Sequence, residues 1–204
     1  MPLALEIHQR FVEVARSLSP ALADAIAQTS PIHLTPNRSA PFPERLCRAI
    51  AGQQLSVKAA LSIWTRVKTR AGSQPLVSYL LQASPEELRA CGLSAAKAKS
   101  MKAVAQAAYE DQLDAQALDL LTHSDRTERL TAIWGVGQWT ADMMGIFYFG
   151  DPDIWPDGDL AARKMLSDLT SPRRKTIRTA ARFAPYRSYL ALYMWHQVNA
   201  PPEI

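Results

Sequence analysis

Cysteine is scarce in this chain of 204 residues, which contains only Cys47 and Cys91. Two thiols are too few for a disulfide scaffold, a four-thiolate zinc site or an iron–sulfur cluster. Long apolar runs are also missing, and the first residues, MPLALEIHQRFVEV, carry charges throughout instead of the basic-then-apolar order of a secretory signal. We therefore expect an intracellular protein without membrane association, located in the cytoplasm or nucleoid if the source is bacterial.

Signals for β-strands are equally scarce, because alternating apolar patterns and Asn-Gly or Asp-Gly hairpin turns are essentially absent. Helix signals recur instead. Ser56 is a predicted N-cap, and SPEEL at residues 84–88 has the pattern of a capping box. Ser171-Pro172 and Ala184-Pro185 are predicted to open two further helices. The sequence therefore predicts an all-α fold.

The composition is that of an ordinary folded protein, with 48% hydrophobic and 21% charged residues. A net charge of +4 permits a polyanionic partner without demanding one. Basic residues gather in KAKSMK at 97–102 and PRRKTIR at 172–178, which are either solvated helix faces or phosphate contacts. The proline-rich segment at 30–43 is a linker or a crossover between lobes.

The segment GVG at residues 135–137 separates two helix patterns. Glycine tolerates positive φ and close backbone approach, so this spacing predicts a compact helix–hairpin–helix. The amide N–H groups that open the second helix are suited to an anion such as a DNA phosphate, with no sequence preference. The same letters also fit a plain corner between helices in which the glycines only relieve crowding, and from this stretch alone both readings stay open.

Three segments, in this order, resemble one family. They are IAGQQLSVKAALSIWTR at 50–66, LTAIWGVGQWTADMM at 130–144 followed by DIWPDGDLAARK, and FAPYRSYLALYMWH at 183–196. This chain resembles the helix–hairpin–helix DNA glycosylase superfamily, and within it the alkyl-purine branch of 3-methyladenine DNA glycosylase II. The resemblance implies a two-lobed all-α fold with the active site in the cleft between the lobes.

The domain organisation implied by the resemblance is a single catalytic domain over residues 1–204. The first lobe spans about 43–115 and carries a loop that plugs the minor groove. The second lobe combines about 1–42 with 116–204, and holds the hairpin at 124–149 and the catalytic aspartate. We expect a monomer.

Asp157 and Asp159 compete for the catalytic role, because either could simply cap the following helix. Spacing does not choose between them. The resemblance selects Asp159, since the family's aspartate immediately precedes this helix. A carboxylate near C1′ stabilises the oxocarbenium character that develops as an N-glycosidic bond breaks, and can position or deprotonate the attacking water.

The resemblance also implies a base pocket made by Trp139, Trp195 and Met143. Aromatic faces attract a cationic alkylated purine by stacking and cation–π contact, each worth on the order of 1–2 kcal/mol when desolvated. Trp139 occupies the position where bifunctional members carry a lysine, so no Schiff base can form and we expect a monofunctional enzyme without lyase activity. Met143 stands where a tyrosine is expected, which can change the substrate range.

The DNA contacts implied by the resemblance lie in the plug loop, in the hairpin and at the start of the last helix. They are Gln53, Gln54, Leu55, Ser56, Gly135, Gly137, Thr140 and Arg187. Gln54 is the expected plug, and Arg187 either forms a structural ion pair or approaches the catalytic aspartate. No cofactor is required, although a structural Na⁺ or K⁺ can bind at the backbone carbonyls of Trp134 and Val136.

The expected function is therefore hydrolytic excision of flipped-out alkylated purines, 3-methyladenine and 7-methylguanine, from double-stranded DNA at the start of base excision repair. One alternative is a glycosylase that prefers hypoxanthine or ethenoadenine. Another is a non-catalytic DNA-binding hairpin module.

Overall fold

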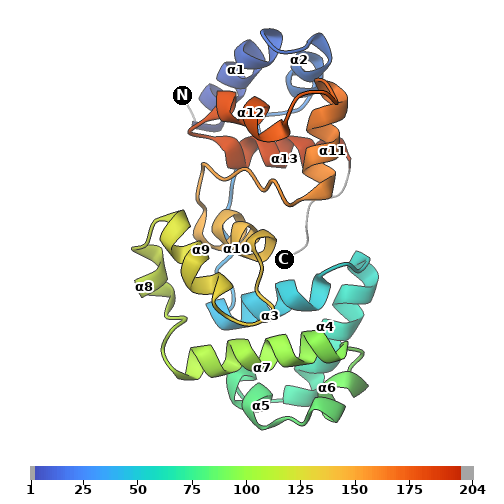
Figure 1. Ribbon diagram of the computed structural model, residues 1–204, viewed down its shortest axis with the longest axis vertical. Coiled ribbons are helices and arrows are strands. Elements are labelled where there is room, and N and C mark those ends of the chain that lie inside the picture. The colour runs from blue at the N-terminus through green and yellow to red at the C-terminus, as the bar shows by residue number, and fades with distance from the viewer. Residues whose placement is uncertain (1–2, 199–204) are drawn as a thin grey trace. The chain divides into compact units, whose positions relative to one another are not determined.

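A computed structural model describes residues 3–198, and this part of the chain is helical without any β-strand (Figure 1). The all-α prediction is confirmed. The chain divides into two compact units, which we describe separately. Unit 1 combines residues 3–36 with 145–198, and unit 2 comprises residues 37–144.

Unit 1 is built by pairing of α1 with α2 and of α11 with α13. Its core contains Phe11 and Phe183, whose rings meet edge to face at 4.9 Å, and Tyr193 packs beside Phe11. All three side chains are buried. The elements of unit 1 are α1 (Leu3–Arg16), α2 (Pro20–Ala27), a π-helical turn η1 (Gly145–Phe149), α11 (Leu160–Leu169), α12 (Thr176–Ala180), a 3₁₀ turn η2 (Ala181–Phe183) and α13 (Arg187–Gln197).

Unit 2 is organised around α7, which packs against α3, α5 and α6, as Figure 1 shows. Apolar side chains at helical spacing on α7, including Met101 and Val104, are fully buried. The elements of unit 2 are α3 (Phe42–Gly52), α4 (Val57–Ala71), α5 (Leu76–Gln82), α6 (Pro85–Ala90), α7 (Ala95–Tyr109), α8 (Ala115–Asp119), α9 (His123–Thr131) and α10 (Gln138–Met144).

The local helix signals have mixed outcomes. Ser56 caps α4 through its side chain, and Ser84 with Glu87 forms the predicted capping box of α6. The helix expected from Ser171-Pro172 is wrong, because α12 begins only at Thr176. Ser171 instead uses its hydroxyl to accept a hydrogen bond from the Arg173 amide, which closes a local turn. The basic residues that follow Pro172 therefore lie in a loop.

The boundary between the units differs from the expected lobes, because residues 116–144 belong with unit 2. A bidentate ion pair between Arg38 and Asp119, at 2.9 and 2.8 Å, ties α8 to the start of this unit. Helix α10 also packs on α3 and α9. The expected hairpin at 124–149 is thus divided, with its two helices in unit 2 and η1 in unit 1.

Candidate active site

Asp159 is the N-cap of α11 and is 9% exposed. Its Oδ1 accepts a hydrogen bond of 2.9 Å from the backbone N–H of Ala162. The turn WPDGD that carries it is closed by a bond from the Asp159 amide to the carbonyl of Pro156. The carboxylate is therefore held in one place by the helix that it caps.

Trp195 lies on α13 and donates its indole N–H to Oδ1 of Asp159 at 3.0 Å. The side chain is 1% exposed, and its ring lies 5.6 Å from that of Phe147. The structure thus brings two predicted site residues together, but it gives Trp195 a donor role toward the aspartate. Sequence spacing could not reveal this bond, because it joins residues 36 positions apart.

Asp157, the competing carboxylate, braces the turn. Its Oδ1 accepts hydrogen bonds from Trp155 Nε1 at 3.2 Å and from Thr176 Oγ1 at 3.1 Å. Its backbone carbonyl accepts another from Arg163. These contacts tie the turn to α11 and to the start of α12.

Arg187 forms the structural ion pair that was one of its two expected roles. Its Nε and Nη2 donate to the two carboxylate oxygens of Asp153 at 2.7 and 2.9 Å, and its backbone N–H also donates to Asp153. The hydrogen bonds from the Arg187 side chain hold the pKa of Asp153 below its usual value, and the same bonds raise the pKa of Arg187. The pair fixes the start of α13 against the segment before the WPDGD turn.

The structure explains why a glycine stands at position 135 but not why one stands at position 137. Gly135 has φ +82°, and a Cβ there would overlap the side chain of Ser100, whose hydroxyl donates to the Trp134 carbonyl at 3.1 Å. Packing within unit 2 therefore accounts for Gly135. Gly137 is exposed, and a Cβ there would meet no atom within 4 Å. Packing within the described residues therefore does not require a glycine at position 137. The exposed backbone there is open to an approaching partner.

Three predicted site residues follow on α10, and they differ in exposure. Trp139 is partly exposed, whereas Thr140 and Met143 are fully buried. The Thr140 hydroxyl accepts a hydrogen bond of 3.0 Å from the side chain of Gln53. This bond connects the hairpin to the predicted plug loop within unit 2.

The predicted plug loop joins α3 to α4. Its tip is Gln54, which is exposed and has φ +56°, followed by Leu55 at 42% exposure. The Lys97 ammonium donates to the carbonyls of Ala51 and Gln53 at 2.9 and 2.7 Å, and burial lowers the pKa of Lys97. The sequence does not indicate this role, because Lys97 looks there like one charge of a basic run.

The basic run at 97–102 is largely structural. Lys102 donates to the backbone carbonyls of Leu80, Leu81 and Ala83 at the end of α5. Lys99 lies over the Trp134 ring, with its Nζ 4.2 Å from the ring centre. Because Lys97 also binds backbone carbonyls, all three lysines of the run make contacts within unit 2.

The hairpin carbonyls were the expected place for a monovalent cation. The Trp134 carbonyl already accepts from Ser100, and a carbonyl oxygen has a second lone pair that can bind a hard cation. Among residues 3–198, no group of three or more His, Cys, Asp or Glu side chains is arranged to hold a metal ion.

The described chain thus has a helical hairpin in unit 2 and a capped, buried aspartate in unit 1. A model of the HhH-GPD superfamily of base excision DNA repair proteins matches residues 47–184, and the chain belongs to this superfamily. The resemblance seen in the sequence is thereby confirmed.

Several relatives have names that are more specific than the superfamily description. DNA-3-methyladenine glycosylase 1 of Schizosaccharomyces pombe is 35% identical over 172 residues, covering 78% of this chain and 75% of that protein. DNA-3-methyladenine glycosylase 2 of Escherichia coli is 26% identical over 170 residues, covering 78% of this chain and 59% of that protein. A solved structure of the S. pombe 3-methyladenine DNA glycosylase with abasic DNA matches with a TM-score of 0.79 at 27% identity, covering 98% of this chain and 99% of that one.

Membrane association was not expected from the sequence. Within residues 3–198, no helix combines the length and the apolar character that crossing a bilayer requires.

Proposed function

We propose that this protein is a DNA glycosylase that hydrolyses the N-glycosidic bond of alkylated purines, 3-methyladenine and 7-methylguanine, in double-stranded DNA. Membership of the superfamily and the names of its relatives support the reaction class. The observation that carries the proposal is Asp159, a buried carboxylate held by the cap of α11 and by the Trp195 indole.

Asp159 would act on the sugar. As the base departs, positive charge develops at C1′, and a fixed carboxylate stabilises this charge without having to reorganise. It can also position or deprotonate the water that attacks C1′. An alkylated purine already carries positive charge and leaves as a neutral base, so the reaction does not need a strong general acid.

Base recognition is assigned to α10. Trp139 would stack on the flipped base, and Met143, one helical turn further along, would shape the same pocket from its buried position. Trp195 would contribute by orienting Asp159, because its indole N–H is already directed at that carboxylate. Stacking on Trp139 favours a cationic base over a neutral one.

The enzyme would be monofunctional. Trp139 provides no amine for a Schiff base with the sugar, so the product is an intact abasic site. Borohydride treatment during turnover should trap no covalent protein–DNA adduct, and strand cleavage at the abasic site should not exceed that of a protein-free sample. A trapped adduct would show lyase chemistry.

DNA contacts are assigned to exposed groups of unit 2. Gln54 and Leu55 would fill the gap left by the flipped base, with Ser56 beside them, and Gly137 would let a phosphate approach the hairpin. We also propose that the carbonyls of Trp134 and Val136 hold a Na⁺ or K⁺, whose charge would strengthen phosphate binding. Replacing these cations with choline should then weaken DNA binding at constant ionic strength.

The test is a base-release assay on a panel of duplexes containing methylated purines, hypoxanthine or ethenoadenine. We expect release of 3-methyladenine and 7-methylguanine, and we expect Asp159→Asn to lower the rate on the order of 10²-fold or more. Asparagine caps helices as well as aspartate does, so α11 should stay intact. Asp157→Asn makes the same chemical change two residues away and should keep most of the activity.

The other outcomes separate the alternatives. Faster release of hypoxanthine or ethenoadenine would identify a glycosylase for those lesions. Tight binding to DNA with no base released from any duplex would identify a non-catalytic binding module. Wild-type rates in Asp159→Asn would overturn the assignment of the carboxylate.

A further inference from the structure

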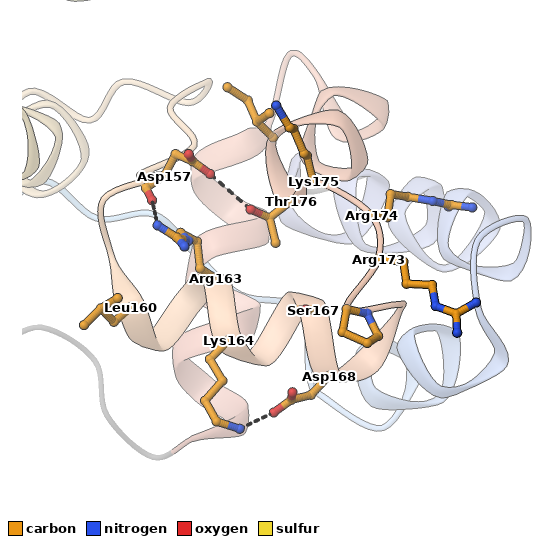
Figure 2. A pocket seen from close by; sticks show the side chains of 12 residues that line it. Asp157, Leu160, Arg163, Lys164, Ser167, Asp168, Arg173, Arg174, Lys175 and Thr176 are labelled. Carbon is orange, nitrogen blue, oxygen red and sulfur yellow. Dashed lines mark hydrogen bonds and ion pairs between the residues drawn. The ribbon is translucent and has the colours of Figure 1, made fainter.

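A basic hollow of about 580 Å³ lies in unit 1, between α11 and the loop that leads to α12 (Figure 2). Side chains from both elements line it, so it is a feature of the fold of this unit. We call it the α11 hollow. Its lining residues are Asp157, Leu160, Arg163, Lys164, Ser167, Asp168, Pro172, Arg173, Arg174, Lys175, Thr176 and Ile177.

Positive charge predominates in the α11 hollow, with five cationic side chains against two carboxylates. Both carboxylates are engaged: Asp168 pairs with Lys164 at 2.5 Å, and Asp157 accepts from Thr176. The remaining excess charge comes from the lining arginines and Lys175.

Three cations of the loop, Arg173, Arg174 and Lys175, are exposed. Within residues 3–198, the side chains of Arg173, Arg174 and Lys175 form no hydrogen bond or ion pair. This loop therefore differs from the basic run at 97–102, whose lysines bind backbone carbonyls or cover Trp134. Charges that are not needed by the fold are available to a ligand.

The same three residues also line a second hollow of about 430 Å³, together with Ser171 and Arg178. The cations are thus shared between two neighbouring depressions instead of converging on one point. Such a spread suits successive charges along a polyanion better than one compact anion. Leu160 and Ile177, which are 76% and 50% exposed, add apolar surface at the α11 hollow that can contact deoxyribose.

The α11 hollow adjoins the turn that carries Asp159. Asp157 and Leu160, which lie on either side of Asp159 in sequence, both line it. Figure 2 shows the bond from Thr176 to Asp157 that joins the loop to the turn. A strand that presents its sugar to Asp159 would therefore bring its neighbouring phosphates toward this surface.

We propose that the α11 hollow and the loop at 171–178 bind the DNA phosphate backbone next to the target nucleotide. This inference rests on the proposed function, which brings DNA to Asp159. The contact adds affinity without sequence preference, because only phosphates and sugars are touched.

The test compares the salt dependence of binding to a duplex with a stable abasic-site analogue. In a triple variant, Arg173→Ala, Arg174→Ala and Lys175→Ala, the slope of log K against log [salt] should become less steep by about 2.7, since three phosphate contacts are lost and each contributes about 0.9. Affinity should fall on the order of 10-fold or more at physiological salt. Thermal unfolding should be nearly unchanged, because these exposed side chains form no hydrogen bond or ion pair within residues 3–198.

A matched control removes the same charge elsewhere. Arg16, Arg70 and Arg89 are exposed and line neither basic hollow, and their triple alanine variant should keep the wild-type slope. If both triple variants lose the same slope, the loop has no special contact and the inference is overturned.

Neutral methylphosphonate linkages, placed one at a time along the strand, locate the contact. Wild type should lose affinity at a few linkages beside the abasic analogue, and the loop variant should be indifferent to those same linkages. Equal losses in both proteins would contradict the inference. Displacement of DNA by inorganic phosphate at matched ionic strength would also overturn it, because that result describes a small-anion site.

Measuring base release by the wild type distinguishes a failure of the proposed glycosylase function from a failure of the proposed backbone contact. DNA binding with the expected slopes but no release of any base would refute the proposed function and leave the backbone contact standing. Normal base release with a wild-type slope in the loop variant would refute the backbone contact alone.

Discussion

The indole N–H of Trp195 and Oδ1 of Asp159 lie 3.0 Å apart, and the same oxygen accepts the Ala162 amide at 2.9 Å. One carboxylate oxygen thus receives two donors from two helices, α11 and α13. The aspartate is oriented by the long-range packing of unit 1 as well as by its local turn.

Trp195→Phe removes this donor and keeps an aromatic ring. Loss of a buried hydrogen bond should lower the free energy of unfolding by about 1–2 kcal/mol, and kcat for base release should fall on the order of 10-fold as the carboxylate loses its fixed orientation. Trp155→Phe is the matched control, since Trp155 donates to the neighbouring Asp157. Equal losses of kcat in the two variants would argue against a positioning role for Trp195.

The two hairpin glycines should respond differently to alanine. Gly135→Ala combines a positive φ with overlap against Ser100, and we expect it to lower stability by about 1–3 kcal/mol. Gly137→Ala meets open space, so it should leave thermal unfolding almost unchanged while weakening binding to duplex DNA. Adding Ser100→Gly to Gly135→Ala should restore part of the stability. Unchanged DNA affinity in Gly137→Ala would contradict the assigned phosphate approach.

Lys97→Met keeps the length of the side chain but removes its hydrogen bonds to Ala51 and Gln53. We expect a stability loss of about 1–3 kcal/mol and a larger relative loss in binding to abasic DNA, because the base of the plug loop is no longer anchored. Lys99→Met, which affects the neighbouring exposed lysine, is the control. Arginine at position 97 should recover part of the binding if the role is to hold these carbonyls.

The pair formed by Asp153 and Arg187 predicts how stability depends on acid. The pKa of Asp153 is lowered from its ordinary value of 3.8, so the unfolded state binds the proton more readily and the pair stabilises the fold above that pH. This contribution is lost as the pH falls below 3.8 toward the lowered pKa. Asp153→Asn and Arg187→Gln should each flatten the acid limb of an unfolding-midpoint profile, and the double variant should flatten it no further. Wild-type steepness in both single variants would count against the pair.

Features set by near neighbours in the sequence were predictable. The caps at Ser56 and Ser84 and the glycine turn depend on residues a few positions apart, and all lie where the sequence predicted. The start of α12 was missed, because Ser171 satisfies the Arg173 amide in a turn before any helix begins. A Ser-Pro pair is compatible both with the start of a helix and with a turn, so Ser171-Pro172 alone does not decide between them.

Contacts between distant segments were not predictable. Trp195 reads as an aromatic wall until α13 is seen to bring its indole to Asp159. Lys97 reads as a surface charge until α7 is seen to place it beside the end of α3. Nothing in the local pattern separates a lysine that holds a loop from one that faces solvent, and only the packed unit distinguishes them.

The hydrogen bond from Gln53 to Thr140 joins the base of the plug loop to the second helix of the hairpin. Under the proposed function, this bond links the hairpin that approaches the phosphate to the loop that probes the base stack. A substitution at position 53 or 140 alone should consequently change the spacing between these two DNA contacts.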